Sequence, residues 1–546
     1  MIRNLLACGV AAVALSLPAV AAAEEVQARP PAGALQGVAE GGLHVFKGVP
    51  YADAPVGPNR WKPPQPAPRW DGVRQATAFG PACIQPTAKV PNLYSQDLGA
   101  TSEDCLTLNV WAPAGGKRAP VLVWIHGGAL SAGSSKDPVY DGARLASRGG
   151  VVVVSINYRL GAFGYLAHPE LSAESARGVS GNYGLLDQIE ALKWVQANIA
   201  AFGGDPANVT IVGESAGGLS VMYLMASPLA RSLFAKAISQ SAYMISTPEL
   251  KQARFGAPAA EQSGLALGAA LRAPSIAALR GLDAQALSDA SAKAGFSPFG
   301  AVDGEVLPAQ LTEIFDQGHQ APAPILVGFN SGEIRSLRIL APREPASPAI
   351  YEATIRERYG DLAEAFLRLY PKSNMPESIL ATTRDALYGW TAERLARSQT
   401  AQGQAAYLYL FDHGYPAADA LGLHGFHASE LPYLFGSRDA TPPLWPRVPK
   451  TADETALSDA MMDYWTSFAR DGRPSAAKAP AWPAYTPGGA YLRFAAAPRV
   501  ERNLMPGMFD LNEAVVCRRH AQGGLAWNWN VGLAAPPLPA AAPSCP

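Results

Sequence analysis

The sequence predicts an α/β protein in which helices cover both faces of a mostly parallel sheet. Three observations lead to this prediction. Short apolar runs rich in β-branched residues recur along the chain, segments with helical periodicity separate them, and one run ends in a turn of small residues before a helix. Continuous apolar runs are typical of parallel strands, because such strands are buried on both faces. With 546 residues, 48% of them hydrophobic, the chain can form a large core.

The predicted strands, in chain order, are residues 121–125, 151–156, 209–212, 235–238 and 325–327. The clearest helix between them covers residues 187–199. Residues from about 250 to 320 and from 340 to 440 look helical and rich in loops, so we expect them to form a cap or the wall of a gorge. Ligands of open α/β sheets bind beyond the carboxyl ends of the strands. We therefore look for chemistry where these runs end.

Ser215 lies at such an end, in the stretch Gly213-Glu214-Ser215-Ala216-Gly217. The apolar run 209–212 precedes it, and a segment with helical apolar spacing follows. A nucleophile elbow has this order of strand, sharp turn and helix, and it needs small residues because neighbouring backbones approach closely. A Gly-x-Ser-x-Gly string alone is weak, but its position after a strand favours Ser215 as a nucleophile.

A serine nucleophile needs a base, an acid that orients the base, and donors for the oxyanion. In this type of fold the chain order is serine, acid, histidine. The histidines that follow Ser215 are His319, His413, His424, His427 and His520. Spacing alone does not choose among them.

Longer motifs occur in a fixed order along the chain, and they comprise residues 48–52, 103–109, 157–161, 181–188, 202–218 and 482–485. Through them the chain resembles the type-B carboxylesterase/cholinesterase family of the α/β-hydrolase superfamily, over nearly all of its mature length. The resemblance implies an α/β-hydrolase fold in which helical and loop insertions form a gorge or cap. It also implies a serine carboxylesterase that hydrolyses carboxylic esters through an acyl-enzyme intermediate.

The resemblance also implies the partners of Ser215. Residues 328–333 align with the family's Gly-x-Asn-x-Asp-Glu-Gly stretch and place Glu333 at the acid, although Gly332 and Ile334 replace the usual aspartate and the trailing glycine. The histidine motif, His-x-x-Glu followed by Phe-Gly, fits residues 427–436. His427 is therefore the expected base, and His424 is its rival.

Supporting residues follow from the same resemblance. The loop after residues 121–125 resembles the family's Gly-Gly-Gly/Ala loop, so the backbone N–H groups of Gly128 and Ala129, with that of Ala216, are expected to form the oxyanion hole. Glu214 and Glu430 are expected to flank the serine and the histidine. Ser241 is expected to form a hydrogen bond near Glu333.

The first residues are typical of a secretory signal, with Arg3, an apolar run over residues 5–20 and small residues at 21–23. We expect cleavage near Ala23 and export, either to the medium or to a periplasm. A lipoprotein box ending at Cys8 is the alternative, but it leaves almost no hydrophobic region before the cysteine. The predicted organisation is a signal peptide (1–23), one catalytic domain (24–535) and a Pro/Ala-rich tail (536–546). The Pro/Ala-rich stretch from Val531 onwards is expected to be poorly ordered.

Cleavage would leave an even number of cysteines, Cys83, Cys105, Cys517 and Cys545. An even number in an exported chain favours disulfides, and three pairings are possible. Pairing of Cys83 with Cys105 would contribute on the order of 3 kcal/mol in the chain-entropy model. Cys517 would then pair with Cys545, unless Cys545 lies free in a frayed end.

The composition argues against several classes of partner. Lys and Arg number 44 and Asp and Glu 45, so neither nucleic acid nor an anionic membrane is indicated. No stretch after the signal is apolar enough to span a bilayer. No Cys/His spacing suits a metal, and we expect no cofactor. The expected partner is a small carboxylic ester, and the oligomeric state is left open.

Two other interpretations remain. A binding module with the same fold is disfavoured because all three triad residue types are intact. An enzyme for lactones, amides or polyesters would use the same triad, and only a substrate panel would distinguish it. Choline esters are disfavoured, because the segment from Cys83 to Cys105 contains no tryptophan to hold a quaternary ammonium, only Tyr94.

Overall fold

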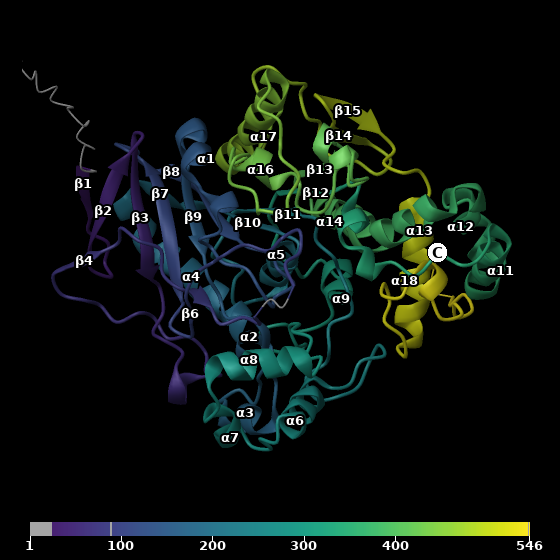
Figure 1. Ribbon diagram of the computed structural model, residues 1–546, viewed down its shortest axis with the longest axis horizontal. Helices are drawn as coiled ribbons and strands as arrows, with labels where there is room; N and C mark the ends of the chain where they lie inside the picture. Colours follow the sequence, from purple (N-terminus) through teal and green to yellow (C-terminus); the bar gives the residue numbers. More distant parts are fainter. Residues whose placement is uncertain (1–23, 88–89, 544, 546) are drawn as a thin grey trace, which may run out of the picture.

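A large, mixed sheet runs through the molecule (Figure 1). The computed structural model describes residues 24–87, 90–543 and 545. In these residues thirteen strands form this sheet, in the order β1-β2-β3-β7-β9-β8-β10-β11-β12-β13-β14-β15, with β4 beside β2. The strands of the sheet are β1 (Glu24–Ala28), β2 (Ala34–Glu40), β3 (Leu43–Pro50), β4 (Val73–Gln75), β7 (Thr107–Pro113), β8 (Ala119–Ile125), β9 (Val152–Ile156), β10 (Gly204–Glu214), β11 (Lys236–Gln240), β12 (Ile325–Asn330), β13 (Ala406–Phe411), β14 (Ala490–Phe494) and β15 (Pro498–Arg502).

The central part of this sheet is parallel, as predicted. Strands β9, β8, β10, β11, β12, β13 and β14 pair in parallel. Towards the edges, β1, β2, β3, β7 and β15 pair with their neighbours in the path antiparallel, and β4 pairs with β2 in parallel. The edge strands β1–β3 lie at the purple end of the sheet in Figure 1. Because parallel strands point the same way, the carboxyl ends of β8, β10, β11 and β12 meet at one edge of the sheet. A separate pair, β5 (Ala82–Cys83) and β6 (Thr101–Ser102), lies outside it.

Helices cover both faces of the sheet, and their packing follows the alternation of side chains along the strands. In β8, Leu122 and Trp124 pack in a cluster with α1 (Ala143–Gly149), α16 (Leu431–Leu434) and α17 (Ala452–Asp471). Val121 and Val123 belong to the opposite cluster, with α4 (Tyr183–Asn198) and α5 (Ala216–Ala226). Successive residues of a strand point to opposite faces, so one apolar run serves two cores. The first of these clusters also contains Trp465.

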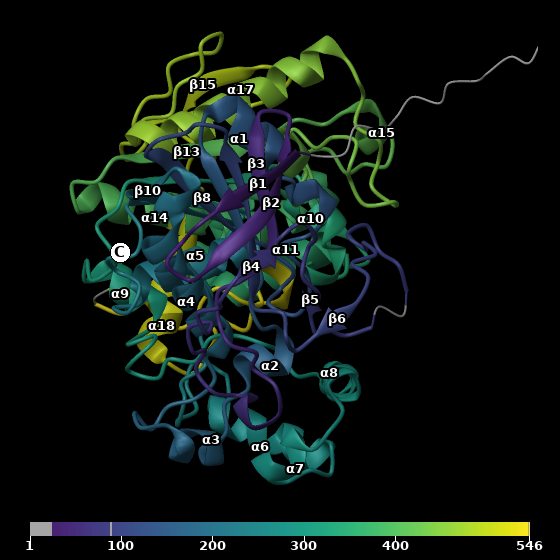
Figure 2. The same cartoon turned by 90° about the vertical axis from the view of Figure 1, so that its left-hand side faces the viewer.

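Two further helical groups extend from this body. Helices α3, α6, α7 and α8 lie at the end of the molecule opposite α17 in both views (Figures 1 and 2). Helices α11, α12, α13 and α18 gather around a third cluster near the C-terminus. The remaining helices have the following bounds: α2 (Gly161–Tyr165), α3 (Pro169–Glu174), α6 (Ala260–Ala270), α7 (Ile276–Arg280), α8 (Ala284–Lys293), α9 (Leu311–Asp316), α10 (Glu333–Ser336), α11 (Pro348–Tyr359), α12 (Ala363–Leu369), α13 (Met375–Arg384), the π-helix η7 (Asp385–Gly389), α14 (Trp390–Ala401), α15 (Pro416–Asp419) and α18 (Met508–Gln522).

The sequence-based expectation for residues 340–440 was incomplete. Strand β13 lies within this range and occupies a place between β12 and β14 in the parallel part of the sheet. All six of its residues are buried. The rest of the range is helical and rich in loops, as expected.

The expectation of a poorly ordered tail was also wrong for residues 531–543. Val531 and Ala535 are buried, and Leu538 packs against the C-terminal cluster. The backbone N–H of Leu538 donates to the carbonyl of Arg358 at 2.7 Å. The tail keeps this position because its apolar side chains pack against the C-terminal cluster.

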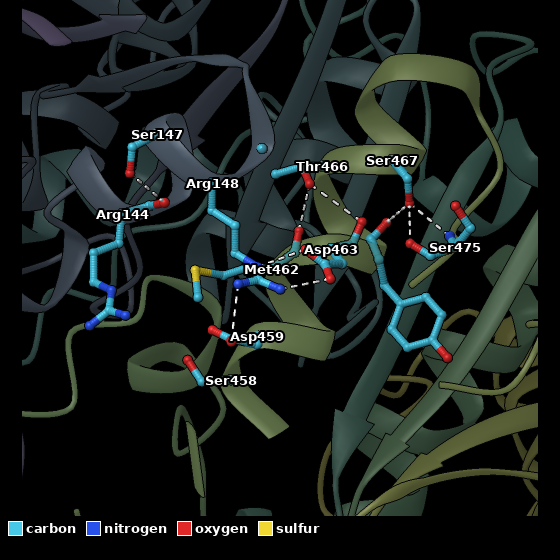
Figure 3. Close-up of polar contacts among 12 residues, drawn as sticks. Arg144, Ser147, Arg148, Ser458, Asp459, Met462, Asp463, Thr466, Ser467 and Ser475 are labelled. Atoms are coloured by element: carbon cyan, nitrogen blue, oxygen red, sulfur yellow. Dashed lines mark hydrogen bonds and ion pairs between the residues drawn. The ribbon is translucent and has the colours of Figure 1, made fainter. Parts of the chain in front are cut away.

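Helices α1 and α17 cross closely over one face of the sheet (Figure 3). Arg148 of α1 pairs with Asp463 at 2.7 Å and with Asp459 at 3.0 Å, both on α17. The hydroxyl of Thr466 donates to the carbonyl of Met462 within α17 at 2.7 Å. A Cβ at Gly149 would overlap the methyl group of Thr466, so the crossing requires glycine there.

Two disulfides connect the predicted cysteines, Cys83 with Cys105 and Cys517 with Cys545. They close segments with sequence separations of 22 and 28 residues. Such bridges are consistent with a protein of an oxidising compartment. In the described part of the chain, no helix combines the length and the apolarity that crossing a bilayer would require. The expected signal peptide, residues 1–23, lies outside the described residues.

Candidate active site

Ser215 occupies the predicted turn between β10 and α5. Its φ of 56° and ψ of −121° lie in a region that residues with a side chain rarely adopt. The backbone N–H of Ser215 donates to the carbonyl of Gln240 at 2.9 Å, which ties the turn to the end of β11. A Cβ at Gly217 would overlap the carbonyl oxygen of Ile125, so α5 approaches β8 closely only because this residue is glycine. The turn therefore presents Ser215 at the carboxyl edge of the sheet.

His427 and Glu333 lie in direct contact, although 94 residues separate them. The imidazole Nδ1 pairs with the carboxylate Oε2 of Glu333. The other oxygen, Oε1, accepts a hydrogen bond from the backbone N–H of Asn330 at 2.8 Å. Glu333 is fully buried and His427 is 6% exposed. The carboxylate is thus fixed by the end of β12 and holds the ring in one orientation.

His424, the rival base, lies elsewhere. Its Nδ1 pairs with Asp419 at 2.7 Å, and both side chains are about half exposed. The structure therefore places His427, and not His424, beside the expected acid.

The departure from the family's acid motif has a steric reason. A Cβ at Gly332 would lie 2.6 Å from the carbonyl oxygen of Leu423 and 2.9 Å from that of Gly425. The backbone N–H of Gly332 also donates to the carbonyl of Gly425 at 2.7 Å. The segment that carries His427 thus approaches the segment that carries Glu333 too closely for an aspartate at position 332.

The other ring nitrogen of His427 faces Glu214. Nε2 lies 3.1 Å from Oε1 of Glu214, the residue that directly precedes Ser215. Among the described residues, none forms a hydrogen bond with the hydroxyl of Ser215. The structure therefore brings His427 to the carboxyl end of β10. There Glu214 contacts Nε2, the nitrogen that would accept the proton of a serine hydroxyl.

Buried charges dominate the electrostatics of the site. Burial by itself lowers the pKa of His427, but attraction to Glu214 and Glu333 outweighs it and raises the pKa to about 9. Burial raises the pKa of Glu214 to about 8, against the opposing attraction of His427. Burial likewise raises the pKa of Glu430 to about 7, with Asn330 acting in the opposite direction. Each carboxyl prefers its neutral form because water is excluded.

Glu430 does not touch the imidazole but anchors the segment that carries it. Its Oε1 accepts a hydrogen bond from Gln240 at 3.1 Å, and its Oε2 accepts one from Asn330 at 2.6 Å. Asn330 also donates to the carbonyl of Phe426 at 2.8 Å. The indole N–H of Trp465 donates to Gln240 at 3.0 Å. This buried network joins β11, β12 and α17 below the histidine.

The sequence did not indicate Gln240, Asn330 or Trp465 as parts of the site. Their partners lie 100 to 225 residues away along the chain, so no local pattern marks Gln240 or Trp465. Only Asn330 carried a signal, because it belongs to the acid motif.

The hydrogen bond expected for the Ser241 hydroxyl near Glu333 is not formed within the described residues, where this buried hydroxyl has no hydrogen-bond partner. Ser241 instead contributes its backbone N–H, which donates to the carbonyl of Gly328 at 2.8 Å.

The expected oxyanion loop follows β8 and passes beside Ser215. A Cβ at Gly127 would lie 3.2 Å from the Cβ of Ser215. Gly128 and Ala129 have φ values of 103° and 55°, so the loop turns sharply there. Within the described residues, the backbone N–H groups of Gly128, Ala129 and Ala216 donate to no acceptor. Three donors without partners are thus available near the serine.

His126 supports this loop from below. Burial lowers the pKa of His126 to about 4, so the ring is neutral at ordinary pH. Its Nδ1 lies 2.9 Å from the carbonyl of Gly127, and its own carbonyl accepts a hydrogen bond from the hydroxyl of Tyr158 at 2.8 Å.

Two tyrosines flank the imidazole of His427. The ring of Tyr94 is 6.3 Å away in an edge-on arrangement, and the ring of Tyr388 is 5.5 Å away. Tyr388 belongs to the π-helix η7, an irregularity that is frequent at functional sites. In the described residues, no group of three or more His, Cys, Asp or Glu side chains is arranged to hold a metal ion.

Comparisons with known proteins show the family of the chain. A model of the carboxylesterase family matches residues 23–510. The chain is 37% identical over 486 residues to the fumonisin B1 esterase of Sphingopyxis macrogoltabida, covering 85% of each chain. It is also 37% identical over 460 residues to the para-nitrobenzyl esterase of Bacillus subtilis (strain 168), covering 83% of this chain and 91% of that one.

Solved structures give the same result at the level of the fold. A PNB esterase structure matches with a TM-score of 0.77 and 35% identity, over 89% of this chain and 99% of that chain. A carboxylesterase from Geobacillus stearothermophilus matches with a TM-score of 0.76 and 35% identity over the same shares. The fold is therefore that of the α/β-hydrolases, and the chain belongs to the carboxylesterase family and is a carboxylic-ester hydrolase.

Proposed function

We propose that Ser215, His427 and Glu333 form the catalytic triad of this esterase. The observation that carries the proposal is the buried pairing of His427 with Glu333, beside the strained turn that presents Ser215. Ser215 attacks the ester carbonyl while Nε2 of His427 accepts the hydroxyl proton. Glu333 holds the proton on Nδ1 and so keeps the ring in the tautomer that can act as a base.

The oxyanion of the tetrahedral intermediate is proposed to bind to the backbone N–H groups of Gly128, Ala129 and Ala216. Their lack of protein acceptors supports this role, since fixed donors cost no reorganisation when charge develops. His427 then returns the proton to the leaving alcohol. A water molecule, activated by the same imidazole, releases the acyl group from Ser215.

Glu214 would act as a partner of the imidazole between turnovers. Its contact with Nε2 must give way to the Ser215 hydroxyl before attack. Attraction between Glu214 and the protonated ring favours this contact, and loss of the proton from the ring weakens it.

The test of the triad uses two neighbouring histidines as a matched pair. Ser215→Ala and His427→Ala should each lower kcat for a p-nitrophenyl ester by about 10³-fold or more. His424→Ala removes an exposed ring that pairs with Asp419, so its kcat should stay within about twofold of the wild-type value. Full activity in Ser215→Ala, or a large loss in His424→Ala with none in His427→Ala, would refute the assignment.

We propose neutral, moderately bulky carboxylic esters as the substrates. The relatives are named for different esters, para-nitrobenzyl esters and fumonisin B1, so the family alone does not select one. Rates across p-nitrophenyl esters of graded acyl size, with one acidic and one choline ester, would define the class. A preference for the choline ester would contradict the proposal.

We also propose export with cleavage near Ala23, one catalytic domain over residues 24–535 and a tail over 536–546. The two disulfides support an oxidising destination. Amino-terminal sequencing of the protein recovered outside the cytoplasm should begin near Glu24. A start at Cys8 would indicate a lipoprotein instead.

A further inference from the structure

The main chain of His427 is held by one hydrogen bond from a distant segment. Its backbone carbonyl accepts a hydrogen bond from the hydroxyl of Tyr94 at 3.1 Å, across 333 residues of sequence. No other described residue donates to this carbonyl. Because His427 is almost fully buried, its carbonyl has little access to water and depends on that donor.

The same phenol also contacts the acid's helix. The oxygens of Tyr94 and Ser336 lie 2.6 Å apart, and Ser336 is on α10, the short helix that begins with Glu333. A phenol carries one proton and a carbonyl can only accept, so the phenol donates to His427. The same proton is shared with the hydroxyl oxygen of Ser336, and the Ser336 hydroxyl donates to the main-chain carbonyl of Glu333 at 3.5 Å. One oxygen thereby connects the segment of the base with the helix of the acid.

The ring of Tyr94 is fixed by aromatic contacts. It lies edge-on to His427 at 6.3 Å and edge-on to Trp445 at 5.8 Å. Its neighbours at 90–92, 97 and 99–100 are exposed, whereas Leu93 and Tyr94 pack against the core cluster that contains Trp445. The disulfide between Cys83 and Cys105 closes the segment that carries Tyr94. Tyr94 is therefore an inward anchor of an otherwise exposed segment.

We propose that Tyr94 is a positioning residue for the catalytic histidine, because its hydroxyl fixes the carbonyl of His427 relative to Ser336 and hence to Glu333. This proposal rests on the proposed triad. On the other side, the backbone N–H of Gly332 joins the two segments by its bond to Gly425. Without the phenol, the main chain of the base would depend on the bond from Gly332 to Gly425 and on the bond from Asn330 to Phe426.

Loss of the hydrogen bond from Tyr94 should slow the chemical step and leave substrate binding unchanged. A shift of the imidazole of about 1 Å changes the geometry of proton transfer from Ser215 and is enough to cost up to about 10²-fold in rate. The bond from Tyr94 goes to main chain, so its loss leaves the acyl-binding surface otherwise unchanged. The signature of positioning is therefore a fall in kcat with an almost constant KM.

The test is Tyr94→Phe, which keeps the ring and removes the hydroxyl. The matched control is Tyr351→Phe, because the hydroxyl of Tyr351 donates to a main-chain carbonyl, that of Tyr370, at 2.9 Å in the C-terminal cluster. With active sites counted by organophosphate titration, Tyr94→Phe should lower kcat about 10-fold with KM within about twofold. It should slow phosphorylation of Ser215 by a similar factor, whereas Tyr351→Phe should change neither rate.

Ser336→Ala keeps the bond to His427 and removes the other contact, so it provides a second measurement if Tyr94→Phe does not fold. It should lower kcat by a smaller factor, and the double variant should be no worse than Tyr94→Phe, because both changes act through one hydroxyl. Unchanged kcat in Tyr94→Phe, a change confined to KM, or additive losses would overturn the proposal. If instead the wild type hydrolyses no ester and Ser215 takes up no label, the proposed function itself fails.

Discussion

At the scale of single residues, the site is a set of three buried carboxyl groups around one imidazole. Glu214 faces Nε2 of His427, Glu333 holds Nδ1, and Glu430 lies in the network beneath. Attraction to Glu214 and Glu333 raises the pKa of His427 to about 9, so the ring binds a proton more tightly than an ordinary histidine. A general base must be neutral, and activity should therefore increase with pH through a range above the usual histidine value.

Glu214→Gln should move the acid limb of the pH profile of kcat/KM to lower pH, by about one unit. The substitution removes the strongest attraction that favours protonated His427, so the pKa of His427 falls and the neutral base is present at lower pH. Hydrolysis of a p-nitrophenyl ester between about pH 5 and pH 10 gives the profile.

Glu430→Gln is the matched control for this shift. The carboxylate of Glu430 is bound by Gln240 and Asn330 and acts on His427 more weakly than Glu214 does. The acid limb of the pH profile should therefore move less in Glu430→Gln than in Glu214→Gln. A profile that stays in place in Glu214→Gln, or moves to higher pH, would show that Glu214 does not control the protonation of the base.

How much of the site could be predicted depends on whether a residue belongs to a contiguous motif. Glu333 and His427 each lie in such a motif, and the structure places them in contact. Tyr94 and Gln240 lie outside the motifs of the acid and the base, and their contacts arise only after the chain folds. The Ser241 hydroxyl, expected to form a hydrogen bond near Glu333, has no partner among the described residues, and no sequence pattern shows which groups a buried hydroxyl meets after folding.

At the scale of elements, apolar patterning predicted five of the parallel strands and missed two, β13 and β14. β8, β9 and β12 stand out as β-branched or leucine-rich runs with both faces buried. β13 has the sequence AYLYLF, in which tyrosine alternates with leucine, and it lies within a long helical region. Its tyrosines are buried against Trp465 and Trp482, so it is as internal as the others. The strand was missed because the whole range 340–440 was interpreted as helical and rich in loops.

At the crossing of α1 and α17, the contributions of ion pairs and of steric fit to stability can be compared (Figure 3). The ion pairs of Arg148 with Asp459 and Asp463 are conspicuous, but about a third of each side chain is exposed. Exposed ion pairs contribute about 0–1 kcal/mol, whereas overpacking of a close contact costs about 1–3 kcal/mol. Steric fit at Gly149 should therefore matter more than charge at Arg148.

Gly149→Ala should lower the free energy of unfolding by about 1–3 kcal/mol, and Arg148→Met by less than about 1 kcal/mol. The added methyl group would overlap the Cγ2 of Thr466. The double variant Gly149→Ala/Thr466→Ser removes that methyl group, keeps a hydroxyl for the carbonyl of Met462, and should recover part of the loss. Thermal unfolding followed by circular dichroism ranks the variants. A larger loss in Arg148→Met than in Gly149→Ala would reverse the order of the two effects.

At the scale of the whole molecule, the C-terminal helices have a core of their own beside the two that flank the sheet, and α13 and α18 contribute to it and to one of those two. The two clusters that flank the sheet contain the residues around Ser215 and His427, whereas the third is built from α11, α12, α13, α18 and the tail. The tail joins this third cluster through Ala535 and Leu538, and the disulfide of Cys517 with Cys545 ties it to α18. Stability and catalysis should therefore be separable by changes at the tail.

Removal of residues 531–546 should shorten the half-life at elevated temperature and leave kcat at 25 °C unchanged. The truncation exposes apolar surface of the third cluster and breaks two hydrogen bonds, from Gly532 to the Tyr359 hydroxyl and from Leu538 to the Arg358 carbonyl, each 2.7 Å. The double variant Cys517→Ser/Cys545→Ser keeps these contacts and removes only the cross-link, on the order of 3 kcal/mol in the chain-entropy model. It should therefore lie between the wild type and the truncated protein. Half-lives are the appropriate measure, because large disulfide-bonded proteins commonly unfold irreversibly. If kcat per titrated site fell together with the half-life, the third cluster would have to support the catalytic sheet, and the separation of the two cores would be wrong.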